Sequence, residues 1–186
     1  MTTKQHVFLI GPPAVGKLTV GHLLSQGTGF PLYDNAKSID TATLLFKYGT
    51  EDFRKFRDEL RFSFYSKATT SCVTGLISSC CLARSSWPYI RRVEALLSAN
   101  SWRTSYFLLT ADDTTIQSRA EFPDRQQKVA LTAPTSIKDW LAKNWPPTFP
   151  KGIDIQQIDT SNVTASDTAT RIKTLLDMNH EPTRTA

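Results

Sequence analysis

The sequence lacks any apolar stretch that approaches the ~20 residues needed to cross a bilayer. Cysteine is scarce: Cys72, Cys80 and Cys81 are the only three, and no Cys-x-x-Cys pair or Cys/His cluster occurs. These absences argue against a membrane span, a disulfide framework and a zinc site. We therefore expect buried, reduced thiols in a cytoplasmic protein, with no membrane partner and no residues that ligate a metal directly.

We expect no signal peptide, because an apolar run that reads as a core strand begins at Val7. The 22 basic and 17 acidic residues give a net charge of +5, but the basic side chains are scattered rather than grouped. This distribution argues against polynucleotide binding and suits small anionic ligands. A length of 186 residues predicts one domain over 1–179, followed by a flexible tail over 180–186.

The most specific pattern is residues 11–19, which read Gly-Pro-Pro-Ala-Val-Gly-Lys-Leu-Thr. They follow a β-branched and aromatic run at 7–10 and precede apolar residues at helical spacing. Strand, glycine-bounded loop, lysine and helix start together predict a phosphate-binding loop. The alternative is a chance glycine-rich turn before a helix. We expect nucleotide contacts from Gly11, Pro13, Ala14, Val15, Gly16, Lys17, Leu18 and Thr19.

Leu18 departs from the general pattern, because a hydroxyl residue that ligates Mg²⁺ directly usually follows the lysine. Thr19 comes one residue later. This order argues against a GTPase-like switch. It is compatible with Mg²⁺ that is held largely by water and by the nucleotide.

Five extended segments alternate with helical periodicity along the chain, at 7–10, 31–35, 72–82, 105–110 and 153–158. This alternation predicts a three-layer α/β fold with a five-stranded parallel sheet and helices on both faces. Ligands of such a sheet bind at the carboxyl ends of its strands. Within the helical region 36–68, the stripe Phe53, Phe56, Leu60 and Phe64 is expected to face the core.

Candidate acceptor residues follow the second predicted strand. Asp34 ends that strand, and its carboxylate could accept a hydroxyl proton or order hydrated Mg²⁺. The alternative role is an Asx turn or a helix cap. Asn35 and Asp40 lie close by in sequence and are weaker acceptor-binding candidates.

Two pairs of basic residues could contact an anionic or hydroxylated substrate. Arg57 and Arg61 share one helix face in the predicted acceptor region 36–68, although such spacing is also common on solvated helices. Arg119 and Arg125 lie in a polar, proline-containing segment, 119–135, which is typical of a mobile lid. Cations on such a lid would neutralise the phosphoryl group during transfer.

The loop and the residues after the second strand resemble the small P-loop kinases of the adenylate-kinase, shikimate-kinase and chloramphenicol-phosphotransferase-like group. The resemblance implies ATP or another NTP as cofactor together with Mg²⁺, and it places Ser161 and Asn162 near the nucleotide base. Two features depart from it. The third strand ends in Ser78-Ser79-Cys80-Cys81 without the usual acidic residue, and no Gly-Gly-Gly follows, which argues against shikimate as substrate.

Three functions remain open at this point. The first is an ATP-dependent kinase that transfers the γ-phosphoryl group to a hydroxyl of a metabolite, nucleoside or antibiotic. The second is a nucleoside monophosphate kinase, and the third is a nucleotide-binding regulatory module with little turnover. The expected partners are a nucleotide and a small-molecule acceptor, and the chain would act as a monomer or a homodimer.

Overall fold

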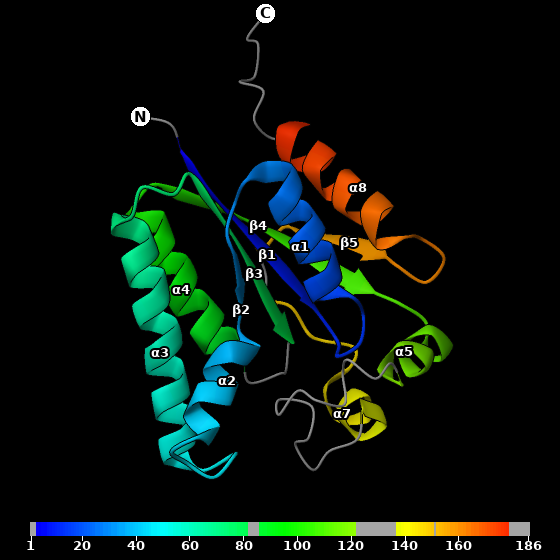
Figure 1. The fold of residues 1–186 in the computed structure, drawn as a ribbon, viewed down its shortest axis with the longest axis horizontal. Helices are drawn as coiled ribbons and strands as arrows, with labels where there is room; N and C mark the ends of the chain where they lie inside the picture. The colour runs from blue at the N-terminus through cyan, green and yellow to red at the C-terminus, as the bar shows by residue number, and fades with distance from the viewer. Residues whose placement is uncertain (1–2, 82–85, 122–136, 151, 179–186) are drawn as a thin grey trace, which may run out of the picture.

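The computed structural model describes residues 3–81, 86–121, 137–150 and 152–178. Its centre is a five-stranded sheet in the order β2-β3-β1-β4-β5, and all neighbouring strands run parallel (Figure 1). This sheet confirms the predicted fold class. The strands are β1 (Lys4–Gly11), β2 (Leu32–Asp34), β3 (Gly75–Cys81), β4 (Trp102–Thr110) and β5 (Ile155–Asp159).

Helices cover both faces of the sheet (Figure 1). Helices α1 (Lys17–Thr28) and α8 (Ala165–Met178) lie side by side on one face, and α3 (Glu51–Thr70) and α4 (Trp87–Ala99) cover the other. Three short helices, α2 (Ala36–Thr43), α5 (Asp113–Ala120) and α7 (Ile137–Asn144), lie near the carboxyl ends of the strands. Among the described helices, none is long and apolar enough to cross a membrane.

The core follows from the two-residue period of the central strand β1. Val7 and Leu9 pack with apolar residues of α1 and α8, whereas Phe8 and Ile10 pack with Trp87 and Ile90 at the start of α4. All of these β1 side chains are at most 1% exposed. A strand that is buried on both faces reads as a continuous apolar run, which is why the sequence identified β1 so readily.

The inward face of α3 differs from the expected aromatic stripe. Phe53 is buried, but Phe64 is 36% exposed and stacks on Tyr33 of β2 with ring centroids 3.8 Å apart. The buried positions on α3 are Phe53, Arg61, Tyr65 and Ala68. The difference has a physical reason. Arg61 is buried because it donates hydrogen bonds to polar groups at the carboxyl edge of the sheet, and the aromatic side of the helix is therefore partly exposed.

Candidate functional site

The phosphate loop connects β1 to α1 at the carboxyl edge of the sheet. Ala14 and Gly16 have positive φ angles of 67° and 101°, a left-handed conformation that is typical of loops whose N–H groups form anion-binding concavities. Gly11 is required for a different reason, since a Cβ atom there would lie 2.4 Å from the carbonyl oxygen of Leu109. The loop backbone therefore has the shape that the sequence predicted for phosphate binding.

Lys17 lies folded over this loop and is only 8% exposed. Its Nζ donates to the carbonyl oxygens of Gly11 at 3.1 Å and Pro12 at 2.7 Å, and to the sulfur of Cys81 at 3.3 Å. These acceptors hold the ammonium at the mouth of the loop. Phosphate oxygens could replace them without a large movement of the side chain.

The side chains of the other loop residues differ in how far they are buried. Pro13 and Val15 are buried beneath the loop, Leu18 is partly buried, and Thr19 is exposed on the first turn of α1. A hydroxyl at position 19 is thus open to solvent or to a nucleotide. Position 18 supplies an apolar contact in place of a metal ligand.

Asp34 ends β2 beside the end of β3. Its Oδ1 accepts hydrogen bonds from the backbone N–H of Ala36 at 3.0 Å and from the hydroxyl of Ser79 at 3.0 Å. The first bond is the Asx turn that the sequence allowed, and the second ties the carboxylate to the neighbouring strand. Asp34 therefore has a structural contact and also a place at the ligand edge of the sheet.

The residues around Asp34 fit a loosely held Mg²⁺ better than a caged one. Among the described residues, no group of three His, Cys, Asp or Glu side chains could hold a metal ion. Mg²⁺ commonly binds through one or two carboxylates, water and substrate phosphates. Asp34 is suited to such a role, through water, and the chain adds no second carboxylate at the end of β3.

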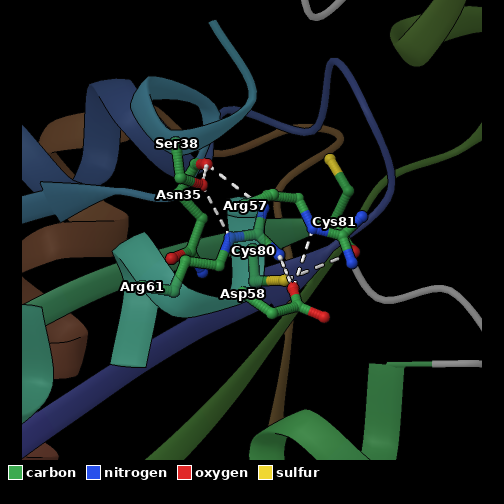
Figure 2. Close-up of polar contacts among 7 residues, drawn as sticks. All are labelled: Asn35, Ser38, Arg57, Asp58, Arg61, Cys80 and Cys81. Atoms are coloured by element: carbon green, nitrogen blue, oxygen red, sulfur yellow. Dashed lines mark hydrogen bonds and ion pairs between the residues drawn. The ribbon is translucent and has the colours of Figure 1, made fainter. Parts of the chain in front are cut away.

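Arg61 is buried, at 8% exposure, and holds α3 against the start of α2 (Figure 2). Its Nε donates to Ser38 Oγ at 2.7 Å, and its Nη2 donates to the backbone carbonyl of Asn35 at 3.2 Å. The Ser38 hydroxyl donates to the same carbonyl at 2.6 Å. The Arg61 guanidinium also lies over the Tyr89 ring, 5.4 Å from its centroid. The backbone carbonyl of Asn35 thus accepts two hydrogen bonds, one from Ser38 and one from Arg61.

Arg57 and Arg61 lie on one side of α3, as the sequence predicted, and they share one carboxylate (Figure 2). Arg57 Nε donates to Asp58 Oδ1 at 2.8 Å, and Arg61 Nη1 lies 3.8 Å from the same oxygen. Asp58 was missed by sequence reasoning, although an acidic residue between two arginines is a visible signal. Asp40 lies on α2 and is partly buried, and its Oδ1 has no hydrogen-bond partner among the described residues.

Arg119, on α5, lies on the opposite side of the phosphate loop from Asp34. Its Nη1 donates to the carbonyl of Val15 at 3.2 Å and to Thr160 Oγ1 at 3.0 Å, and its Nη2 donates to the Thr160 carbonyl at 2.7 Å. Arg119 thus joins the loop to the turn after β5. Thr160, which is 3% exposed, directly precedes Ser161 and Asn162, and its hydrogen bonds with Arg119 could not be predicted from the sequence. Arg125 and most of the predicted lid lie outside the described residues.

The turn after β5 also contains Ser161 and Asn162. Ser161 Oγ accepts from the backbone N–H of Asp112 at 2.9 Å and donates to Asp159 Oδ1 at 2.7 Å, while Asn162 is exposed beside it. Hydrogen bonds from Thr114 and Thr115 lower the pKa of Asp112 to about 2. This part of the edge is a hydrogen-bonded turn next to the phosphate loop.

Comparisons with known proteins agree with this architecture. No protein-family model matches the chain. The chain is 33% identical over 81 residues to shikimate kinase of Methylococcus capsulatus and 36% identical over 66 residues to that of Tolumonas auensis. These matches cover 40% and 32% of this chain, and they span only 45% and 38% of the relatives' own lengths.

Solved structures resemble the chain over nearly its whole length. A sugar kinase of Janibacter gives a TM-score of 0.63 at 17% identity, covering 94% of this chain and 95% of that one. APS kinase of Mycobacterium tuberculosis, solved with AMPPNP and APS, gives 0.64 at 11% identity, covering 95% and 99%. Shikimate kinase of Aquifex aeolicus gives 0.55 at 18% identity, covering 94% and 97%. At these identities the likeness shows the fold alone, which is that of the small P-loop kinases.

Proposed function

We propose that this chain is an ATP-dependent small-molecule kinase that transfers the γ-phosphoryl group to an acceptor hydroxyl. One observation carries the proposal: the end of β3 contacts the lysine of the loop on one side and a carboxylate on the other. Cys81 lies 3.3 Å from Lys17 Nζ, and Ser79, two residues earlier on β3, donates to Asp34. A γ-phosphate over the loop and an acceptor beside β2 would therefore meet at the end of β3.

The chain's own residues would then divide the work of phosphoryl transfer. The loop amides and Lys17 hold the β- and γ-phosphates and neutralise their charge. The acceptor oxygen bonds to the γ-phosphorus as the bond to the β–γ bridging oxygen breaks, and ADP leaves with that electron pair. Asp34 accepts the hydroxyl proton. Mg²⁺, when bound through water near Asp34, supplies further charge neutralisation at the phosphates.

The same proposal includes the cellular setting expected from the sequence: ATP or another NTP as donor, a cytoplasmic location, and a monomer or homodimer. A nucleotide-binding module with little turnover is the second candidate. It is favoured by the end of β3, which carries thiols at Cys80 and Cys81 and no carboxylate.

An acceptor screen with γ-labelled ATP tests the proposal. Nucleosides, nucleotides, sugars, polyols and phenicol- or aminoglycoside-type compounds are offered with the wild-type chain and with Lys17→Met. Label that appears in a hydroxyl compound, and disappears in the variant, supports the kinase. Label on a nucleoside monophosphate supports the nucleotide kinase instead. ATP binding without label transfer to any compound contradicts both and supports the regulatory module.

A further inference from the structure

The carboxamide of Asn35 is the most unusual polar group on the acceptor side of the sheet. Asn35 is 3% exposed, and neither its Oδ1 nor its Nδ2 has a hydrogen-bond partner among the described residues. Its backbone carbonyl, in contrast, accepts from both Ser38 and Arg61. The backbone of the residue is therefore held in place, while the Cys80 thiol is the only polar neighbour recorded for its side chain among the described residues.

Such an arrangement is costly, because a buried donor or acceptor without a partner destabilises the fold. Buried polar groups without partners are few in native proteins, and each calls for an explanation. The surroundings give little compensation here. The Cys80 thiol, whose pKa is raised mainly by burial, offers the Asn35 side chain a weak sulfur contact. A ligand that binds here would satisfy the carboxamide.

The charges around Asn35 limit what that ligand can be. The guanidinium groups of Arg57 and Arg61 both face the Asp58 carboxylate (Figure 2). Asp34, which directly precedes Asn35, adds a second negative charge. Among the described residues, the two arginines on this side are thus matched by the carboxylates of Asp34 and Asp58, and α2 adds one further residue of each charge, Lys37 and Asp40. In the part of the chain that the structure describes, a carboxylate or phosphate on the acceptor would therefore find no excess of positive charge beside Asn35.

We propose that the acceptor is an uncharged polyol, and that Asn35 is the residue that recognises its hydroxyl groups. A carboxamide offers one acceptor and two donors, so it can accept from one hydroxyl and donate to the next. The carboxamide atoms of Asn35 are shielded from solvent, so binding requires rotation of this side chain toward Asp34. Ser38 and Arg61 act as positioning residues, because they fix the backbone from which the side chain rotates. This inference rests on the proposed kinase function.

Matched pairs of compounds test the substrate class. D-sorbitol is compared with D-gluconate, and D-glucose with D-glucuronate, because each pair differs only in a terminal CH₂OH against a carboxylate. ADP formation is measured for each compound. We expect kcat/KM to be at least about tenfold higher for the neutral member. Equal or better turnover of the acids overturns the inference and leaves the kinase proposal intact. No phosphorylation of any of the four compounds overturns the inference, while the wider acceptor screen still decides the kinase proposal.

Variants of Asn35 test the recognition role. Asn35→Leu keeps the size but removes both polar atoms, and Asn35→Ser serves if leucine does not fold. We expect KM for the neutral acceptor to rise about tenfold or more while the Kd for ATP stays within twofold. The Tm of the free protein should stay equal or rise with leucine, because an unpaired amide has been removed. Asn100→Leu, at the exposed C-terminal end of α4, is the matched control and should not change KM. An unchanged acceptor KM in a folded Asn35 variant overturns the inference.

Discussion

The ammonium of Lys17 donates a hydrogen bond to the sulfur of Cys81 across 3.3 Å, although the two residues lie 64 positions apart in the chain. This contact joins the phosphate loop to the end of β3. Lys17 is also more buried than its sequence position suggests, at 8% exposure, because it lies against the carbonyls of Gly11 and Pro12. Its aliphatic stem therefore contributes packing, and a test of its charge must preserve that stem.

Lys17→Met removes the charge and keeps the stem. We expect the Kd for ATP to rise at least about tenfold, because charge-assisted bonds to phosphate are lost, with little change in Tm. Isothermal titration and thermal unfolding measure the two quantities. Lys173→Met, on the exposed side of α8, is the control. It removes a surface ion pair with Asp177, and the Kd for ATP and the Tm should both stay unchanged. ATP affinity within twofold of wild type would show that the loop does not bind phosphate through Lys17.

Asp34→Asn tests the carboxylate at the end of β2. An amide oxygen can still accept from Ala36 N–H and from Ser79, so we expect the fold and the Kd for ATP to change little. Turnover should fall about 10²–10⁴-fold, because the general base is lost. Steady-state kinetics with the acceptor found in the screen gives the answer. Ser79→Ala is the companion variant: it removes one contact to Asp34 and leaves the base, so its effect should be much smaller. Unchanged turnover in Asp34→Asn would remove Asp34 from the catalytic role.

The parts of this molecule that sequence alone predicted are local. The run from β1 through the loop to α1 needs only apolar patterning, glycines and one lysine within 20 residues, and the parallel sheet follows from the alternation of strands and helices. The same local signal identified Asp34 as a residue at the end of a strand. Its bond to Ser79 spans 45 positions and could not be read from spacing.

What sequence missed depends on packing between distant segments. The inward face of α3 was misassigned because four aromatic or aliphatic residues at helical spacing predict a buried face, whereas an arginine in a helix is normally expected to be exposed. In the structure, Arg61 finds Ser38 and the Asn35 carbonyl 23 and 26 positions away, and these bonds decide which side of the helix is buried. The unpaired carboxamide of Asn35 is visible only once its surroundings are known.

His6 provides a prediction about pH. This residue of β1 is 1% exposed and contacts Thr104 Oγ1 and Ser78 Oγ, and burial lowers its pKa from 6.5 to about 3. Between pH 6.5 and pH 3, His6 is therefore protonated in the unfolded chain and neutral in the folded chain. The contribution of His6 to the free energy of unfolding is fully present above pH 6.5 and is lost as the pH falls toward 3. At pH 5 the loss should be about 2 kcal/mol relative to pH 8. Urea unfolding of wild type and His6→Gln at both pH values isolates this contribution. An equal pH dependence in the two proteins would contradict it.

Arg119 gives the last prediction, because two roles for it lead to different measurements. The sequence pattern favours a lid cation that acts mainly during transfer. The structure shows three hydrogen bonds, to the Val15 carbonyl and to the hydroxyl and carbonyl of Thr160, which favour an anchoring role.

Arg119→Lys keeps the charge but cannot reproduce the planar fork that reaches all three acceptors. We therefore expect a Kd for ATP that is raised about fivefold and a Tm that is lowered by a few degrees, since the loop loses its link to the turn after β5. Arg171→Lys, on an exposed position of α8, is the matched control. If only the transfer rate falls while the Kd and Tm remain at wild-type values, then Arg119 acts on the transferring phosphoryl group and its resting contacts add little. Hydrogen exchange at Val15 and Thr160 separates the two roles independently, because faster exchange there in the variant requires the anchoring contact.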